Sequence, residues 1–288
     1  MQIGKALLSG LASSYLLFAA DSQTLVTVDW LAEHRQDADV VILDARPEAE
    51  YVKGHIPGAI LVNTYDHLVD SSPQGEKEFH QWIVETFSRA GIGPDDQAIV
   101  YEDKLGMRAA RAYWLLCYAG QSTVKILEGG LEAWRQKQLP ISTDPTPPRT
   151  ATRYRVKPQR KWMATAQEVA ASAKGRKVLI LDVRTREEYE GKSGSPDCAR
   201  QGRIPGAVWV EWTEFLSPDH LSFQAPETLG VLLMQKGITP DKQIVVYCHR
   251  GARAATVWAA LDELGYPKVK NYIGSWHDWA GKRDLPAN

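Results

Sequence analysis

The stretch VVILDARPEAEY at residues 40–51 returns as VLILDVRTREEY at residues 178–189. Three further pairs of blocks follow in the same order: GHIPGAI (54–60) with GRIPGAV (202–208), GIGPDDQAIVYE (91–102) with GITPDKQIVVYC (237–248), and VKILEGGLEAW (124–134) with VKNYIGSWHDW (269–279). Because the four pairs recur in register, with a period of roughly 145 residues, the pattern indicates a duplicated domain rather than a short solenoid repeat.

The chain of 288 residues is long enough for about two domains. We place the first domain at 23–142 and the second at 162–288. Between them, TDPTPPRTATRYRVKPQRK (143–161) is rich in proline and threonine, which is typical of an extended linker. The second copy also carries an insert of ten residues around KSGSPDCARQ (192–201), between its first two blocks.

Within each copy, apolar runs rich in β-branched residues alternate with helical patterns. VVILD and VLILD end in aspartate, and AIVY (98–101) and IVVY (244–247) are equally apolar, so all four are predicted to be buried parallel strands. RAARAYWLLCYAG (108–120) and RAATVWAALDELGY (253–266) have apolar residues at helical spacing and a glycine near the end. The fold class is therefore α/β, in which ligands bind beyond the carboxyl ends of the strands.

Composition limits the classes of function. The hydrophobic fraction is 44% and the net charge is −1, so the chain is globular and has no basic field to attract nucleic acid. Its three cysteines, Cys117, Cys198 and Cys248, are too few for a disulfide framework and too scattered for a structural zinc site. No metal, flavin or nucleotide site is visible in the sequence, so we expect no cofactor.

The N-terminus has the form of a weak export signal. Lys5 precedes a short apolar run, ALLSGLASSYLLFAA (6–20), and Ala20-Asp21-Ser22 offers a cleavage site between small residues. Residues 1–22 are therefore a candidate signal peptide, which would place the mature protein in the periplasm or another exported location. The alternative is an N-terminal helix packed on a cytoplasmic protein. No later segment reaches the ~18–20 uninterrupted apolar residues of a membrane-spanning helix.

The two copies differ most in the loop that follows AIVY or IVVY. The second copy continues with CHRGAR (248–253), whereas the first has EDKLGMR at the same place. Cys248 is expected at the N-terminus of a helix, where backbone N–H groups and the helix dipole favour an anion. Arg250, Arg253 and a protonated His249 would add positive charge, and these factors together favour a thiolate. The carboxylates of the first copy would repel an anion, so we predict that this copy is catalytically silent.

The remaining candidates have simpler explanations. Cys117 lies in an apolar helix and is expected in the core, whereas Cys198 lies in the polar insert and is expected to be an exposed loop thiol. Asp182 and Arg184 are expected to form an ion pair that supports the loop, because the same pair recurs in the silent copy. The segment GSWHDW (274–279) is a candidate for a wall of the cleft or for the core.

These motifs resemble the rhodanese family, in particular the two-domain thiosulfate/3-mercaptopyruvate sulfurtransferases. The matching pieces are LDAR and LDVR, GHIPGA and GRIPGA, CHRGAR after VVY, and YIGSWHDW near the C-terminal end, and they cover nearly all of residues 25–288. The resemblance implies two tandem rhodanese-like domains, each a parallel five-stranded sheet flanked by helices, with one active site at their interface. It also implies that Cys248 carries a persulfide during turnover.

Loop length and loop charge bear on the substrate. From Cys248 to Arg253 the pattern is C-x4-R, one residue shorter than the C-x5-R loops of the related phosphatases and arsenate reductases. Ala254 stands at the longer spacing and cannot clamp an oxyanion. CHRGAR resembles the basic loops that favour thiosulfate more than the CGSGVT loops that favour mercaptopyruvate. Arg250 and Arg253 would hold the sulfonate of thiosulfate by charge-assisted hydrogen bonds.

One position departs from the family pattern. Some family members have an arginine just before the aromatic residue that follows Asp-x-Arg, where it clamps the substrate, and this chain has Glu188 there. The departure disfavours mercaptopyruvate as the donor. Arg200, in the insert, is an alternative contact for an anion.

The predicted activity is that of a thiosulfate sulfurtransferase with ping-pong kinetics. Thiosulfate would give its outer sulfur to Cys248, and the persulfide would be held by His249, Arg250, Gly251, Ala252 and Arg253. Cyanide, a thiol or a dithiol protein would accept the sulfur, and we expect a monomer that binds no nucleic acid and, after processing, no membrane. The alternatives are a 3-mercaptopyruvate sulfurtransferase and a persulfide carrier that delivers sulfur to a partner.

Overall fold

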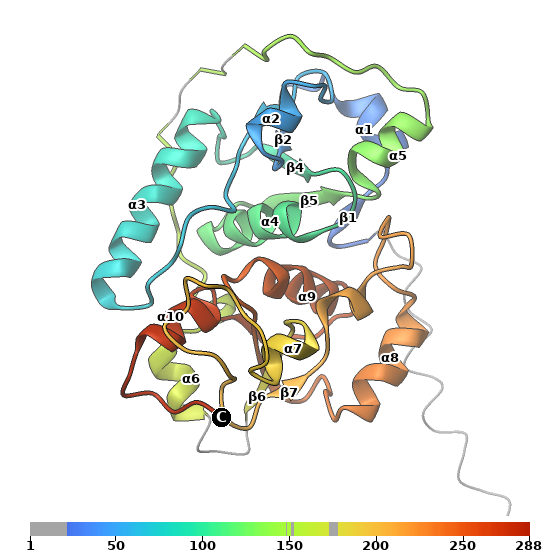
Figure 1. Ribbon diagram of the computed structural model, residues 1–288. Coiled ribbons are helices and arrows are strands. Elements are labelled where there is room, and N and C mark those ends of the chain that lie inside the picture. Colours follow the sequence, from blue (N-terminus) through green and yellow to red (C-terminus); the bar gives the residue numbers. More distant parts are fainter. Residues whose placement is uncertain (1–21, 148, 151–152, 173–177) are drawn as a thin grey trace, which may run out of the picture.

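The computed structural model describes residues 22–147, 149–150, 153–172 and 178–288. The candidate signal peptide at 1–22 therefore lies, except for its last residue, outside the described residues. Two α/β domains follow one another along the chain, and helices α4 (Met107–Ala119) and α9 (Ala252–Glu263) lie between their sheets (Figure 1). In the part of the chain that the structure describes, no helix is long and apolar enough to cross a membrane.

The first domain contains five parallel strands: β1 (Leu25–Val26), β2 (Val40–Asp44), β3 (Ile60–Leu61), β4 (Gln97–Tyr101) and β5 (Thr123–Leu127). They form one sheet in the order β1-β5-β4-β2-β3. The central strands β2 and β4 are buried, as their apolar runs predicted, and pair along their whole length. Asp44 therefore lies opposite Tyr101 at the carboxyl edge of the sheet.

Four further helices flank the sheet of the first domain: α1 (Val28–His34), α2 (Glu48–Tyr51), α3 (Pro73–Arg89) and α5 (Gly130–Gln136). The helix predicted at 108–120 is α4, and Gly120 ends it in the left-handed conformation with φ 89°. A glycine adopts that conformation without steric cost, so the sequence signal for the end of α4 is confirmed.

The second domain has four parallel strands among the described residues: β6 (Val178–Asp182), β7 (Val208–Trp209), β8 (Gln243–Tyr247) and β9 (Val269–Asn271). They form a sheet in the order β7-β6-β8-β9, so the expectation of five strands in each domain is wrong for this copy. Met163 takes the place of the fifth strand, because it forms a single parallel bridge with Asn271 on the far side of β9. The corresponding strand β1 is only two residues long, and one lost pair is enough to remove it.

The second domain is completed by α6 (Ala166–Ser172), α7 (Arg186–Tyr189), α8 (Pro226–Gln235) and α10 (Ser275–Gly281), and by the 3-10 turns Arg160–Trp162 and Trp212–Phe215. A capping box begins α7, in which the Thr185 hydroxyl accepts the Glu188 N–H and the Glu188 carboxylate accepts the Thr185 N–H. This box fixes where Glu188 stands relative to the strand β6.

One hydrophobic core runs through both domains, because α4 and α9 pack directly against each other. Alanines on both helices, among them Ala112 and Ala255, are fully buried and allow the two backbones to approach closely. Trp258 on α9 is 1% exposed and its ring lies 6.1 Å from that of Tyr113 on α4. Cys248 belongs to the same core cluster, so the predicted nucleophile lies next to the domain interface.

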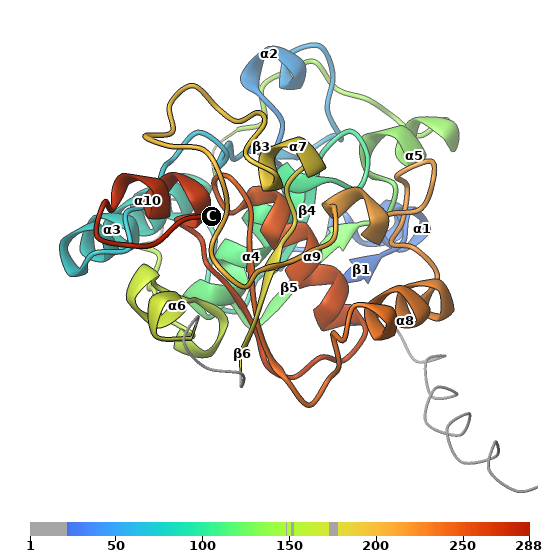
Figure 2. The ribbon, with the colours of Figure 1, turned by 60° about the horizontal axis from the view of Figure 1, so that its bottom comes forward.

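A second contact joins the domains at the start of α3, which lies beside α10 (Figure 2). The Ser71 hydroxyl donates to the Asp278 carboxylate, and Lys282 forms an ion pair of 3.2 Å with Asp70. These polar contacts at the edge and the apolar contact of α4 with α9 fix the orientation of the two domains.

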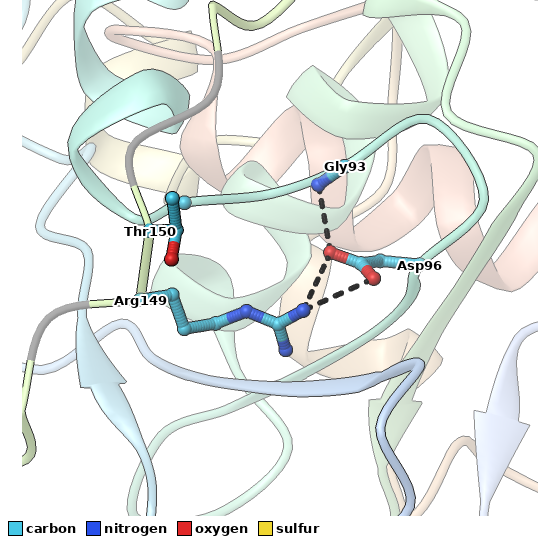
Figure 3. Close-up of a pocket in the computed structure, with 5 residues that line it drawn as sticks. Gly93, Asp96, Arg149 and Thr150 are labelled. Carbon is cyan, nitrogen blue, oxygen red and sulfur yellow. Dashed lines mark hydrogen bonds and ion pairs between the residues drawn. The ribbon is translucent and has the colours of Figure 1, made fainter.

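The connection between the domains is tied to the first domain by Arg149. Its guanidinium lies 3.2 Å from both carboxylate oxygens of Asp96, and that carboxylate also accepts the Gly93 N–H at 2.7 Å (Figure 3). Asp96 and Arg149 line a small pocket of the first domain and are paired with each other. Their ion pair anchors the connection between the domains.

We expect Trp258→Ala to lower the free energy of unfolding by about 3–5 kcal/mol, because it removes a large side chain from the shared core and leaves a cavity. Urea unfolding followed by circular dichroism measures this change. Val231→Ala is the control, since Val231 on α8 is 58% exposed and its loss is expected to cost less than about 0.5 kcal/mol. Equal effects of the two substitutions would contradict a core shared by both domains.

Candidate active site

Cys248 stands where β8 ends, and the tight turn that follows leads into α9. Gly251 is the N-cap of α9 and has φ 83°, and a Cβ there would lie 2.5 Å from the Ile273 carbonyl oxygen. Only glycine fits this turn, which brings the Gly251 N–H to 3.1 Å from the Cys248 Sγ. A sulfur at the N-terminus of a helix, with an amide donor aimed at it, is well placed to carry negative charge.

Ser275 fixes the other end of the loop. The sequence placed it only within a segment that was a candidate for the cleft wall or the core, and did not predict this role. The Ser275 Oγ accepts the Cys248 N–H at 3.1 Å and donates to the Tyr272 carbonyl at 2.7 Å, while the Cys248 Sγ lies 4.0 Å away. Its φ is 54°, an uncommon conformation for serine. The neighbouring Trp276 and Trp279 are fully buried in the core of the second domain, so the segment 274–279 contributes a serine to the loop and two tryptophans to the core.

Cys248 lines a pocket of about 350 Å³ that both domains enclose. The first domain contributes Tyr65 and Met107, and the second contributes Trp212 and the loop residues His249, Arg250, Ala252 and Arg253. The Cys248 residue itself is 1% exposed, so a donor must enter this pocket to reach the sulfur. No sequence signal singled out Tyr65 or Met107, because their distance from the loop depends on how the two domains dock.

Both arginines of the loop are paired with carboxylates. Arg253 forms two hydrogen bonds with Glu188, at 2.6 and 2.9 Å, and Arg250 forms one with Asp197 at 2.8 Å. The Glu188 pair is well shielded, with 16% and 13% of the two side chains exposed, whereas the Asp197 pair is nearer to solvent, with 26% and 34%. The resting loop is therefore less positive than its sequence suggests.

The electrostatics of the loop follow from these pairs. Burial alone would raise the pKa of Glu188, but the Arg253 guanidinium overrides it and holds the pKa at about 2. Burial, with the charges of Arg250 and Arg253, lowers the pKa of His249 to about 4 despite the opposing effect of Asp197. His249 is neutral at pH 7, so the expectation that a protonated His249 adds positive charge is wrong.

Cys198 is brought to the loop by the insert, and it is not the exposed thiol that its sequence context predicted. It is partly buried, its Sγ lies 3.5 Å from the His249 Nδ1, and the His249 Nε2 lies 3.3 Å from Asp197. These three residues could offer one metal ligand each. The imidazole turns Nδ1 to Cys198 and Nε2 to Asp197, and of these two contacts only the one with Cys198 is a hydrogen bond. Burial, followed by the Asp197 charge, raises the pKa of Cys198 to about 11, so its thiol is protonated at neutral pH.

Two other candidates lie away from the sulfur chemistry. Arg200 donates to the carbonyl oxygens of Trp279, Lys282 and Leu285, so it anchors the C-terminal segment and is no anion contact. Cys117 on α4 packs against the shared core, and burial raises the pKa of its thiol to about 12.

Asp182 and Arg184 form a buried ion pair of 2.6 Å beneath the loop. The Tyr247 hydroxyl, on the last residue of β8, donates to the same carboxylate, and Arg184 also donates to the Gly202 carbonyl at 2.8 Å. The first copy repeats this arrangement with Asp44, Arg46 and Tyr101. Since the copy without the cysteine keeps the network, its role is to connect β6, β8 and the GRIPGA turn.

Glu102 occupies the position of Cys248 in the first domain, and its carboxyl group fills the N-terminus of α4. Its carboxylate accepts the N–H groups of Arg108 and Ala109 at 2.7 and 2.9 Å, at the start of α4. Burial raises the pKa of Glu102 to about 7 although these two hydrogen bonds oppose it. The first copy thus lacks a nucleophile, and its anion-binding groups are already bonded to a side chain.

The comparisons with known proteins agree with this architecture. The family model described as rhodanese-like domain matches residues 27–137 and 165–282. The sulfur carrier protein TtuD of Thermus thermophilus is 34% identical over 281 residues, which cover 93% of this chain and 97% of the relative. The thiosulfate sulfurtransferase of Azotobacter vinelandii is 31% identical over 86% of this chain and 90% of its own, and the 3-mercaptopyruvate sulfurtransferase of Escherichia coli is 32% identical over 91% and 96%.

A solved structure shares the fold at lower sequence identity. The anaerobic ergothioneine biosynthesis enzyme from Chlorobium limicola is 21% identical and superposes with a TM-score of 0.81, covering 92% of this chain and 70% of that one. At this identity the likeness concerns the fold alone.

We expect Glu188→Gln to reduce the fall in melting temperature that the protein shows at acidic pH. The folded-state pKa of Glu188 is about 2, below its usual value of 4.5, so its contribution is complete above pH 4.5 and is lost as the pH falls toward 2. Melting temperatures measured between pH 5 and pH 2 should therefore fall more steeply for the unmodified protein than for the variant. Glu33→Gln, an exposed change on α1, should follow the unmodified curve, and parallel curves for all three proteins would exclude this role of Glu188.

Proposed function

The chain belongs to the rhodanese family and is a sulfurtransferase, and we propose that thiosulfate is the donor from which Cys248 takes a sulfur atom. The observation that carries the proposal is the Cys248 Sγ at the start of α9, with the Gly251 N–H 3.1 Å away, inside a pocket whose lining includes Arg250 and Arg253. This geometry supports an anionic sulfur as attacking group, as persulfide and as leaving group.

In the first step, the Cys248 thiolate attacks the outer sulfur of thiosulfate. A sulfur–sulfur bond to Cys248 forms, the bond to the sulfonate sulfur breaks, and sulfite leaves with its electron pair. The product is the Cys248 persulfide, whose terminal sulfur lies in the pocket beside the start of α9. The N–H groups at the helix start act there as an electrostatic cradle for negative charge.

In the second step, a nucleophile attacks the terminal sulfur of the persulfide. Its bond to that sulfur forms, the bond between the two sulfurs breaks, and Cys248 leaves as the thiolate with which the cycle began. Cyanide yields thiocyanate, and a thiolate yields a persulfide of the acceptor. Atoms and electrons balance in both steps without a metal or a redox cofactor as reactant.

The loop charges support a dianionic donor, but the two arginines contribute differently. The bidentate Arg253–Glu188 pair is shielded and holds α9 to α7. The Arg250–Asp197 pair is a single contact near solvent, and such pairs are worth only about 0–1 kcal/mol. Arg250 is therefore the residue that can turn from Asp197 to the sulfonate of a bound donor.

A persulfide carrier is the second candidate function. The relative from Thermus thermophilus is named a sulfur carrier protein, and this chain matches 97% of its length. A carrier of this kind would load sulfur onto Cys248 by the same first step and give it to a protein thiol instead of a small molecule. Fast transfer to a dithiol protein with slow transfer to cyanide would favour this function.

The persulfide is tested by the intact mass of the protein before and after thiosulfate. We expect a gain of one sulfur, about 32 Da, that cyanide removes, because the acceptor takes the terminal sulfur of the covalent intermediate. Cys248→Ser should abolish the gain, whereas Cys198→Ser should retain it. A gain in mass with 3-mercaptopyruvate but not with thiosulfate would make 3-mercaptopyruvate the donor. A gain in mass in Cys248→Ser would overturn the assignment of Cys248 as the residue that carries sulfur.

Asp197→Asn tests the role of Arg250 in donor binding. The change removes the carboxylate that competes for Arg250, so we expect KM for thiosulfate to fall by roughly three- to tenfold, with little change in kcat. Glu190→Gln is the matched control in the same segment, because Glu190 pairs with Arg186 and Lys192 instead of the loop. An unchanged KM in Asp197→Asn, or a lower one in the control, would contradict this role.

A further inference from the structure

The peptide group between Arg250 and Gly251 is held on both of its sides. On one side the Gly251 N–H points to the Cys248 Sγ at 3.1 Å. On the other side the Arg250 carbonyl oxygen accepts a hydrogen bond from the guanidinium of Arg111. Because the C=O and N–H of a trans peptide point in opposite directions, the group that holds the oxygen also aims the N–H at the sulfur.

Arg111 comes from the first domain and has no freedom to move. It lies in the middle of α4, is 0% exposed, and also donates to the carbonyl oxygens of Thr64 at 2.9 Å and His67 at 2.6 Å. Two of its three carbonyl partners belong to its own domain, and the third is Arg250 in the catalytic loop. The guanidinium therefore fixes the loop of one domain to the framework of the other.

The charge of Arg111 differs from the charges on the loop itself. Arg250 and Arg253 each face a carboxylate, whereas no carboxylate of the described residues forms an ion pair with Arg111. Burial lowers the pKa of Arg111 to about 10, which still leaves it charged at neutral pH, and the strongest opposing influence is the charge of Cys248. The first domain thus supplies a positive charge near the sulfur that forms no ion pair with a carboxylate of the described residues.

We propose that Arg111 is a positioning residue for sulfur transfer, which holds the Arg250–Gly251 peptide so that the Gly251 N–H stabilises the anionic sulfur of Cys248. Arg111 does not line the pocket, so it acts through this peptide and not by touching the donor. The proposal rests on Cys248 as the residue that carries sulfur, but it does not depend on which donor supplies that sulfur.

The test compares Arg111→Met and Arg111→Lys in the full-length protein. We expect kcat with thiosulfate to fall by about tenfold or more in Arg111→Met, with KM changed less than about twofold, because a stabilising donor is misaligned while the pocket is kept. Arg111→Lys keeps the charge but cannot reach three carbonyl oxygens. Its kcat should therefore lie between that of the unmodified protein and that of Arg111→Met. The alkylation rate of Cys248 by iodoacetamide at pH 7 should fall in the same order.

Tyr113→Phe is the control for the domain interface, since Tyr113 is on the same helix and contacts Asp262 of α9 without touching the loop. It should leave kcat and the alkylation rate unchanged. If Arg111→Met does not fold, Arg111→Lys decides the question. A kcat of Arg111→Lys equal to that of the unmodified protein overturns the proposal. A rise in KM without a fall in kcat, or equal losses in Tyr113→Phe, would also overturn it, because both indicate a loosened interface.

Alkylation separates this proposal from the proposed donor. If thiosulfate loads no sulfur onto the unmodified protein, the donor assignment fails, and the alkylation rates of the variants still measure whether Arg111 supports the Cys248 sulfur. If thiosulfate loads the protein and the Arg111 variants react at the unmodified rate, the donor assignment stands and the positioning role fails.

Discussion

The packing of α4 against α9 is the contact on which the rest of the molecule depends. It merges the apolar interiors of two α/β domains into one core, and it brings the starts of both helices to the same pocket. Tyr65 and Met107 become walls of a site whose proposed nucleophile, Cys248, lies in the other domain. The same contact brings a buried guanidinium to the backbone of the catalytic loop, which a single domain of this type would lack.

The duplication shows which parts of the site are scaffold and which are chemistry. Both copies keep an aspartate, an arginine and a tyrosine linked beneath the loop, with nearly the same distances, so this network belongs to the fold. The copies differ in the loop above this network, which begins with Cys248 in the second copy and with Glu102 in the first. One domain keeps the proposed nucleophile, and the other supplies walls of the pocket and the arginine that we propose holds the loop.

Local patterns predicted most of the fold, because the strands, the helix ends and the Asp-x-Arg pair depend on residues close in sequence. The prediction of five strands in the second domain was wrong at Met163, because a two-residue edge strand carries almost no signal in the sequence. The insert was the larger gap, because nothing in its composition showed that Asp197 and Cys198 would fold back onto His249. Arg111 read as part of an amphipathic helix, and its carbonyl partner Arg250 lies 139 residues away, a separation that no local pattern spans.

Because of Glu102, the N-termini of α4 and α9 differ in how they depend on ligands from solution. The Glu102 carboxyl group that occupies the N-terminus of α4 is part of the chain. Its hydrogen bonds there do not depend on the concentration of any ligand. The N-terminus of α9 would receive further negative charge only from a bound anionic donor. By mass action, a donor that binds the folded protein stabilises it, and this gain extends to both domains because they share one core and both line the pocket. The supply of donor is therefore coupled to the folding equilibrium of the whole protein, although only the second domain carries the cysteine.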